Sequence, residues 1–327
     1  MFTVVNAGLE TTIQDYPGRI GYLNQGFPPS GPMDHWSFRL ANVLVGNEVG
    51  DAALECQFIG PELRFHEDTV VAVTGGDMQP QIDGVPIELW RSYAVKATQT
   101  LKLSYAKTGA RGYIAVAGAI RTDPWLGSRA TFHKARVGGL KGRAIQVGQQ
   151  IPTGDASCGT PDMLVIPAAQ PKLSYDKRWE IEVVAGPNDD WLDDAGIRTF
   201  LEANWKLSAK SDRTGYRLEG PGDRLTFSAK AINKRPEHGC EPSNIIDQGY
   251  PNGAINLAGM TPIILVNDGP TMGGFINPFT VPTCGFWKLG QLRPGEMIRF
   301  CVIAVDEAHH LACQMTRICS KDSLRQA

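Results

Sequence analysis

A carboxylate and an imidazole stand side by side where a stiff loop meets a predicted helix. The stretch PPSGPMDHWSFRLANVLVGN (28–47) opens with three prolines and a glycine and reaches Asp34 and His35 before its apolar repeat. Both side-chain types can transfer protons in a reaction. Asp is also a favoured N-cap, and a helix N-terminus attracts anions. The residues therefore predict either a cap alone or a cap that also faces a ligand.

Further polar residues follow strand-like sequence in the C-terminal half. Asp268 comes after the apolar run PIILV and before a turn with Gly273, where a missing side chain lets a ligand approach the backbone. Asn244 and Asp247 follow a proline in EPSNIIDQGY, and as a pair they can position an amide. The alternatives are an Asp-Gly-Pro turn without chemistry and a loop that is hydrogen-bonded to itself.

A basic segment with two glycines offers a different kind of site. Lys134 and Lys141 flank Gly138–Gly139 in HKARVGGLKGR. Two ammonium groups beside a glycine turn can bind a carboxylate or a phosphate. The alternative is an ordinary charged surface loop.

A histidine and a cysteine near the C-terminus have the spacing of neighbours on a helix. His309 lies one helical turn before Cys313, and His310 follows directly. A third ligand is not visible in the sequence, so it predicts no metal site.

Composition bounds the class of protein. The chain has 327 residues, 42% hydrophobic and 20% charged, with a formal net charge of −2. The neutral balance disfavours nucleic acid as a partner. Because no apolar run reaches a membrane span and the N-terminus lacks signal-peptide features, we expect neither membrane insertion nor export. Seven cysteines without a CxxC motif are typical of free thiols in a reducing cytoplasm.

The elements that must position these residues are mostly strands. With 36 glycines and 22 prolines, short alternating runs are separated by many turns. Helices are predicted from Asp34 to Gly46, over 189–205, and at the C-terminus with Asp306 as cap. The predicted domains are 1–155 and 178–305, both β-rich, with a connection over 156–177 and a terminal helix over 306–327.

Eight segments in one order carry a family resemblance across about residues 2–304. They are TTIQDYPGRIGY, the 28–47 stretch with ALECQFIGPELRF, GYIAVAGAI, LGSRATF, GGLKGRAIQVG, SDRTGYRLEGP, EPSNIIDQGYPNGAI and PIILVNDGPTMGGF. Together they resemble the biotin-dependent carboxyltransferase family, also called allophanate hydrolase subunit 2. This family includes the carboxyltransferase region of urea carboxylase and the C subunit of bacterial 5-oxoprolinase.

The resemblance implies a mainly β fold with a few helices, arranged as two cyclophilin-like β-barrel domains. It also implies transfer of CO2 from carboxybiotin to an amide nitrogen. Such a transfer needs a general base, donors for developing negative charge, and groups that position the amide. The residues expected to carry the reaction are Asp34, Asp268 and Lys134. Those expected to bind the substrate are Ser30, His35, Asn244, Asp247 and Gly273.

The chain lacks two signatures that the complete reaction requires. It contains neither a Met-Lys-Met biotin carrier motif nor a GxxxxGK[ST] phosphate loop. We therefore expect carboxybiotin to be supplied by a separate carrier protein. On this hypothesis the partners are a sister subunit, a biotin carboxylase, the biotin carrier and a small amide substrate.

Three functions remain open on the sequence. Segments such as SGPMDHWSFRLAN and DGPTMGGF resemble the urea carboxylase branch, whereas ATFHKARVGGLKGR resembles the 5-oxoprolinase subunits more. The first function is carboxylation of urea or a urea-like amide. The second is that of the C subunit of an ATP-dependent 5-oxoprolinase. The third is a non-catalytic regulatory module of the type that antagonises a kinase inhibitor.

Overall fold

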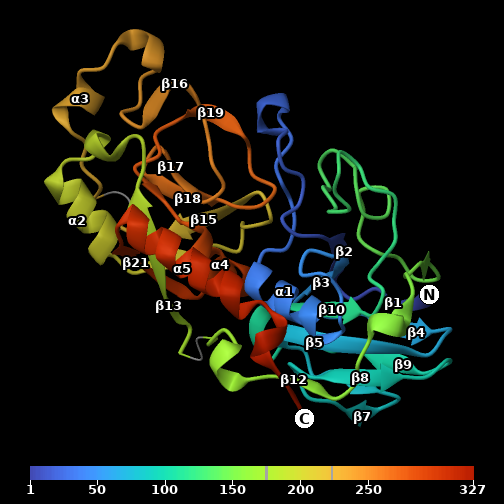
Figure 1. Cartoon of the computed structure of the whole chain (residues 1–327). Coiled ribbons are helices and arrows are strands. Elements are labelled where there is room, and N and C mark those ends of the chain that lie inside the picture. Colours follow the sequence, from blue (N-terminus) through green and yellow to red (C-terminus); the bar gives the residue numbers. More distant parts are fainter. Residues whose placement is uncertain (174–175, 222–223) are drawn as a thin grey trace. The chain divides into compact units, whose positions relative to one another are not determined.

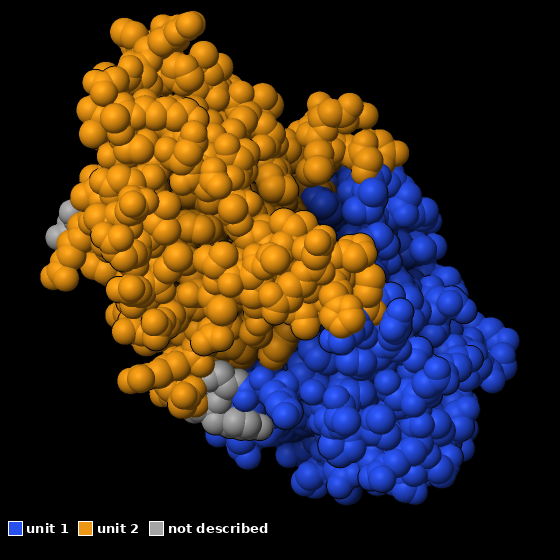
Figure 2. Space-filling view, turned by 60° about the vertical axis from the view of Figure 1, so that its left-hand side comes forward, with its two compact units in different colours: residues 1–20, 29–173, 314–327 blue, residues 21–28, 174–313 orange. Residues whose placement is uncertain are grey.

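The computed structural model of the protein describes residues 1–173, 176–221 and 224–327. They form two compact units, coloured separately in Figure 2. Unit 1 contains residues 1–20, 29–173 and 314–327, and unit 2 contains residues 21–28 and 174–313. Residues 156–173 of the predicted connection thus fall in unit 1, while residues 174 and 175 of that connection lie outside the described part of the chain.

The two large sheets of unit 1 share one core (Figure 1). The first has the strand order β11 (Gln150–Ile151), β1 (Phe2–Asn6), β4 (Glu62–Phe65), β9 (Thr100–Lys102), β6 (Gln81–Ile82), β7 (Val85–Pro86). The second has the order β2 (Glu10–Gln14), β3 (Ala53–Gln57), β10 (Thr108–Val116), β5 (Thr69–Asp77), β8 (Ser92–Val95). Neither sheet closes on itself, so the expected barrel of this half is a pair of sheets.

Strand β5 shows why the second sheet is buried on both faces. Val71 and Val73 join the core between the sheets, whereas Val70 and Ala72 pack in a second cluster with helix α1 (His35–Leu44). Since side chains alternate along a strand, a nearly continuous apolar run satisfies both faces. Helix α1 therefore lies against β5 and β10, which carry the residues that contact its first turn.

Unit 2 contains a closed barrel, which confirms the predicted mainly β fold with a barrel in this half. Its strand order is β13 (Arg178–Ala185), β20 (Phe279–Thr280), β17 (Ala254–Ala258), β18 (Thr261–Leu265), β15 (Gly215–Glu219), β14 (Trp205–Leu207), β21 (Met297–Val302). Strands β13 and β21 pair in parallel, and all other pairs of the barrel are antiparallel. A separate ribbon pairs β16 (Asn244–Gly249) with β19 (Met272–Phe275). Unit 2 also contains the helices α2 (Asp194–Glu202), α3 (Ala229–Ile232) and α4 (Phe286–Gln291).

Local sequence signals account for several boundaries. Asp34 caps α1 by accepting a hydrogen bond from Ser37 N, and Gly46 follows the helix with φ +77°, so both predicted ends are confirmed. The Asp83–Gly84 hairpin joins β6 to β7 with both residues at positive φ, as a two-residue turn requires.

Two helix predictions were too long. Helix α2 begins after Asp193, whose carboxylate caps Gly196 N, while Trp205 belongs to β14 instead of the helix. The C-terminal helix α5 (Val305–Ile318) stops before the end, and Asp306 lies in its first turn rather than at its cap. Residues after it form β22 (Leu324–Gln326), which pairs with β12 (Met163–Val165). A long-range strand partner thus replaces the predicted last helical turns.

The cysteines, the helix lengths and the potential metal ligands can each be compared with the structure. All seven cysteines are free thiols. Among the described residues, helices are too short or too polar to cross a bilayer. Within the same residues no three metal-binding side chains gather, although Cys313 Sγ lies 3.5 Å from His309 Nε2.

The barrel core depends on Phe200 of α2. Its ring is fully buried and stacks on Phe279 and Phe300, with ring centroids 4.9 Å apart in each case. We expect Phe200→Ala to lower the free energy of unfolding by about 3–5 kcal/mol, because it removes these contacts and leaves a cavity. Denaturant unfolding measures the loss. Ile232→Ala is the control, since that side chain is 64% exposed; equal effects of both changes would contradict the packing described.

Candidate functional site

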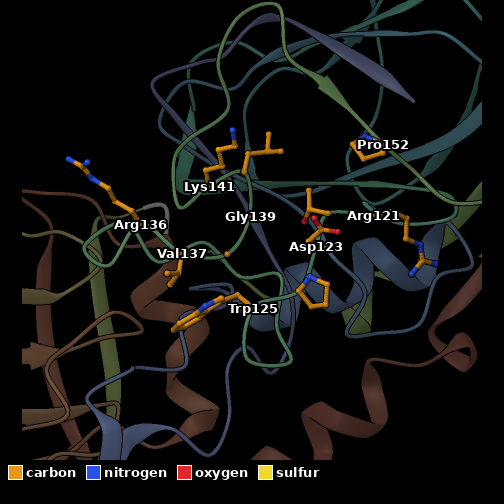
Figure 3. A pocket seen from close by; sticks show the side chains of 12 residues that line it. Arg121, Asp123, Trp125, Arg136, Val137, Gly139, Lys141 and Pro152 are labelled. Carbon is orange, nitrogen blue, oxygen red and sulfur yellow. The ribbon is translucent and has the colours of Figure 1, made fainter.

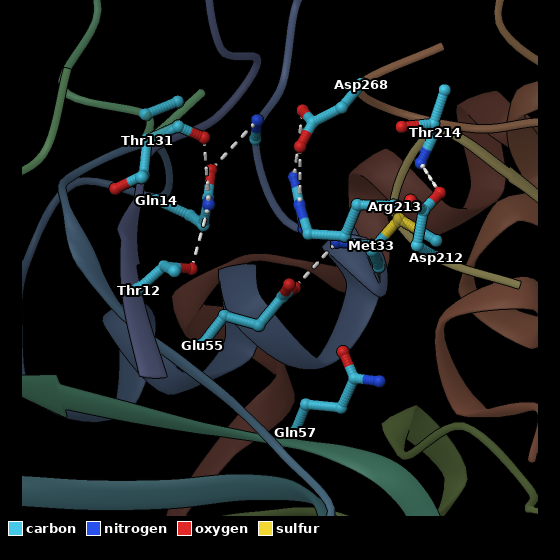
Figure 4. A network of polar contacts seen from close by, with 12 residues as sticks. Thr12, Gln14, Met33, Glu55, Gln57, Thr131, Asp212, Arg213, Thr214 and Asp268 are labelled. Carbon is cyan, nitrogen blue, oxygen red and sulfur yellow. Dashed lines mark hydrogen bonds and ion pairs between the residues drawn. The ribbon is translucent and has the colours of Figure 1, made fainter. Parts of the chain in front are cut away.

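The loop before helix α1 is held by a buried carboxylate on strand β3. Glu55 Oε2 accepts a hydrogen bond from Met33 N at 2.8 Å (Figure 4) and another from Tyr113 Oη, also at 2.8 Å. Glu55 Oε1 lies 3.6 Å from Arg111 Nε on β10. Glu55, Tyr113 and Arg111 are all buried. A buried charge needs such partners, so this network ties the loop to two strands.

Asp34 takes part in the same network through its backbone. Its N–H donates to Tyr113 Oη at 2.8 Å, while its carboxylate accepts from Ser37 N at 2.9 Å and from Ser37 Oγ at 2.5 Å. The Asp34 side chain is fully buried. The capping interpretation is therefore confirmed, and proton transfer by Asp34 stays a hypothesis.

A second set of bonds shapes the loop at its turn. Gln14 Oε1 accepts from Gly31 N at 3.0 Å, and Gln14 Nε2 donates to Thr12 Oγ1 at 3.0 Å (Figure 4). Ser30 and Gly31 both have positive φ, at +57° and +82°, so the chain turns sharply there. Ser30 is buried, as is His35, whose ring stacks on Tyr16 at 5.6 Å. Ser30 and Asp34 on the loop and His35 at the start of helix α1 are thus all buried.

Lys134 lies in an exposed turn. The neighbouring Arg136 and Lys141 line a pocket of about 600 Å³ together with Gly138 and Gly139 (Figure 3). The glycine pair was therefore a better guide to the pocket than Lys134, which is not among its lining residues.

In unit 2, Asp268 forms a buried ion pair. Arg213 Nε donates to Asp268 Oδ2 at 2.9 Å and Arg213 Nη2 to Asp268 Oδ1 at 3.4 Å, while Asp268 N donates to Arg213 O (Figure 4). Asp212, the residue before Arg213, accepts from Thr214 N at 2.7 Å. The SDRTG motif thus braces the turn after β18. This bidentate partner gives Asp268 the structural role in a turn that was the alternative on the sequence, and its catalytic role stays a prediction.

The other predicted residues of unit 2 share the β16–β19 ribbon. Asn244 pairs with Phe275 at one end of the ribbon, and Gln248 pairs with Gly273 nearer the other. Tyr250 Oη fastens the ribbon by donating to Phe275 O and accepting from Phe275 N. Asp247 is exposed. Asn244, Asp247 and Gly273 therefore lie on one element, which is compatible with joint substrate contacts.

The buried thiols are poor candidates for a nucleophile. Burial, reinforced by Glu182, raises the pKa of Cys284 to about 11. Burial likewise raises the pKa of Cys319 to about 12. At neutral pH both remain protonated, and the thiolate is the reactive form.

Glu55 is the structural residue that sequence reasoning missed. Glu55 sits in ALECQ, where every residue up to Cys56 is buried. A carboxylate inside an otherwise apolar strand was the available signal, because it requires a partner from elsewhere in the chain.

The comparisons with known proteins agree with this architecture. The family described as "Carboxyltransferase domain, subdomain A and B" matches residues 25–302. Urea amidolyase of Lachancea kluyveri is 38% identical over 95% of this chain, which spans 17% of that protein. The C subunit of 5-oxoprolinase from Escherichia coli is 31% identical over 94% of this chain and 93% of its own length. The crystal structure of Kluyveromyces lactis urea carboxylase matches the whole chain with 36% identity and a TM-score of 0.91, over 30% of that chain.

These matches define a domain of the carboxyltransferase class, spread over both units. The chain belongs to the carboxyltransferase domain family, as the resemblance implied. Its relatives in this family are enzymes or enzyme subunits by name.

Tyr113 provides a test of the network. Burial first, then the charges of Glu55 and Asp34, raise its pKa well above the usual value. The folded protein therefore keeps this proton above about pH 10, where the unfolded chain releases it. Stability is thus intact below that pH and falls as the pH rises beyond it, by about 1.4 kcal/mol per pH unit for this group.

We expect Tyr113→Phe to remove this contribution to the loss of stability at alkaline pH. At neutral pH it should cost about 1–3 kcal/mol, because Asp34 N–H and Glu55 lose a partner. Denaturant unfolding of both proteins from pH 7 to 11 measures the loss of stability at neutral pH and its further change at alkaline pH. Parallel pH profiles of stability for the two proteins would refute the raised pKa of Tyr113.

Asp268→Asn tests the ion pair of unit 2. Removing one partner of a buried pair leaves Arg213 uncompensated, so we expect a loss of about 3–5 kcal/mol in unfolding free energy. Asp247→Asn is the matched control, because its carboxylate is exposed and its loss should stay within about 0.5 kcal/mol. A stable Asp268→Asn protein with lost turnover would instead make Asp268 a catalytic group.

Proposed function

We propose that this chain is a carboxyltransferase component that moves CO2 from carboxybiotin to the nitrogen of urea or a urea-like amide. The observation that carries the proposal is the match of the whole chain to urea carboxylase at a TM-score of 0.91 and 36% identity. The identity to urea amidolyase, 38%, also exceeds the 31% to the 5-oxoprolinase subunit.

The buried network of unit 1 supports a site at the start of helix α1. Transition states of carboxyl transfer develop negative charge, which pre-positioned donors stabilise. Glu55, Tyr113 and Gln14 hold the backbone from Gly31 to Asp34 rigidly, as such a site requires. On this proposal Ser30 and His35 contact the substrate and Asp34 orients the helix end towards it.

The remaining proposed roles belong to more accessible groups. Lys134 is exposed, so its ammonium group is accessible to the carboxylate of carboxybiotin. Asn244, Asp247 and Gly273 on the β16–β19 ribbon offer an amide, a carboxylate and an accessible backbone for binding an amide substrate. Carboxybiotin itself would come from a biotin carboxylase and a carrier, because the chain has no carrier signature.

The C subunit of a 5-oxoprolinase is the second candidate. The chain covers 93% of the Escherichia coli subunit but only 17% of the urea amidolyase. The basic segment around Lys134 also resembles that branch. On this interpretation the partners are sister subunits of one complex and biotin is dispensable.

A reconstituted assay separates these functions. The purified chain is combined with biotin carboxylase, biotinylated carrier, ATP and radiolabelled bicarbonate, and transfer of label to urea is measured. We expect urea-dependent fixation that avidin abolishes, and Lys134→Gln should lower the rate at least roughly tenfold without changing Tm. Lys107→Gln, another exposed lysine of unit 1, should leave the rate unchanged.

Two results would overturn the first proposal. One is the absence of labelled product with urea and with other small amides although the carrier is carboxylated. The other is ATP-dependent cleavage of 5-oxoproline with sister subunits in the presence of avidin. If neither reaction occurs and only a regulatory protein binds, the chain is a non-catalytic module.

A further inference from the structure

Arg39 carries a buried charge that the described part of the chain does not balance. It lies on helix α1, and its side chain is 4% exposed. Within residues 1–173, 176–221 and 224–327, its guanidinium group forms neither an ion pair nor a hydrogen bond, and its Nε atom is buried. A buried guanidinium group without a partner has lost its hydration and gained nothing in exchange. It therefore indicates a partner from outside the chain. Water would satisfy its N–H groups, but only an anion would also balance its charge.

The surroundings of Arg39 in unit 1 are aromatic. Its guanidinium carbon lies 5.1 Å from the centroid of the Tyr16 ring. Tyr16 also stacks on His35, one helical turn before Arg39, with ring centroids 5.6 Å apart. The face of a ring attracts a cation but accepts none of the hydrogen bonds in the plane of the guanidinium group. These N–H groups are therefore available to a ligand.

The segment after helix α5 supplies no counter-charge. Cys319 lies beside α1, with its Sγ 3.9 Å from Trp36 O (Figure 1). Burial raises the pKa of this thiol to about 12, although the charge of Arg39 opposes the rise, and the charge of Asp34 adds to it. Cys319 is therefore a neutral thiol at neutral pH. The next residue, Ser320, has a buried hydroxyl group that likewise lacks a partner among the described residues.

The charge of Arg39 selects the kind of anion. The carboxylate of Asp34 is engaged by Ser37 N and Ser37 Oγ, and no carboxylate in the described ranges pairs with Arg39. One unbalanced positive charge in a buried place favours a monovalent anion, because a dianion would leave a buried negative charge in its turn. The planar N–H groups of arginine match two oxygens of one oxyanion, an arrangement that chloride does not offer.

We propose that Arg39 binds a small monovalent oxyanion in unit 1. Its guanidinium group donates two parallel hydrogen bonds to two oxygens of the ion, while its face stays packed on the Tyr16 ring. Two sources share this chemistry: bicarbonate and a small carboxylate such as formate. The bound ion neutralises Arg39 and so stabilises unit 1 around helix α1. This inference is independent of the proposed function, because it requires neither turnover nor biotin.

Thermal unfolding of the full chain in different salts tests the proposal. Sodium formate and sodium bicarbonate are titrated at one pH and constant ionic strength, with sodium chloride as the balancing salt and inorganic phosphate as the dianion. We expect a monovalent oxyanion to raise Tm saturably by about 2 °C or more, with a half-maximal effect at millimolar concentration. Phosphate should raise Tm less. The larger of the rises with formate and bicarbonate identifies the source of the ligand.

Arg39→Met separates an anion site from a structural arginine. Methionine fills a similar space without a charge, so in chloride alone this variant should be as stable as the wild type or more stable. It should lose the rise in Tm with formate and bicarbonate. Arg39→Lys keeps the charge but not the paired N–H groups, and should raise the half-maximal concentration at least roughly tenfold. Arg64→Met, at an exposed arginine of β4, is the control and should leave the response unchanged.

Three results would overturn the proposal. Equal Tm values in chloride and in the oxyanions would leave water as the partner of Arg39. A rise in Tm that persists in Arg39→Met would place the bound ion elsewhere. A folded Arg39→Met protein with a lower Tm than the wild type in chloride alone would show that Arg39 has a partner within the chain. Should Arg39→Met not fold, an unchanged response in Arg39→Lys overturns the proposal and a weakened response supports it.

Discussion

The carboxylate of Glu55 is the constraint on which the organisation of unit 1 depends. It is buried in the second sheet, so leaving it without partners would cost several kcal/mol. Met33 N–H and the Tyr113 hydroxyl satisfy it, and Tyr113 in turn accepts the N–H of Asp34. The loop and the start of α1 are therefore fixed by the same charge. A proline-rich loop supplies stiffness, but the buried network supplies its position.

In unit 2 a buried ion pair holds a turn, as Glu55 holds the loop in unit 1. Arg213 and Asp268 close the turn after β18, while the β16–β19 ribbon is left with exposed apolar side chains such as Met272 and Ile246. The residues that hold the fold and those that suit substrate contacts are thus separated within this unit. The Asp268 carboxylate is engaged by Arg213, whereas residues of the ribbon such as Asp247 are exposed.

The basic loop of unit 1, residues 134–141, bears both on the choice of substrate and on the position of a site. The segment around Lys134 is where the sequence resembles the 5-oxoprolinase branch, and its continuation through Lys141 lines the pocket. The branch-specific sequence and the pocket therefore lie on one loop.

The sequence by itself determined the local features. Alternating runs predicted the strands, Asp34 and Gly46 marked the ends of α1, Asp83–Gly84 marked a hairpin, and the ordered motifs indicated the family. Each of these depends on residues close together in the chain, whose propensities act locally. Only the tertiary structure decided that Glu55 joins Tyr113, that Asp268 joins Arg213, that Lys141 instead of Lys134 lines the pocket, and that the last residues form β22. These features depend on partners far away in the sequence. Burial and strand pairing are decided by contacts in the folded chain, which local propensities do not specify.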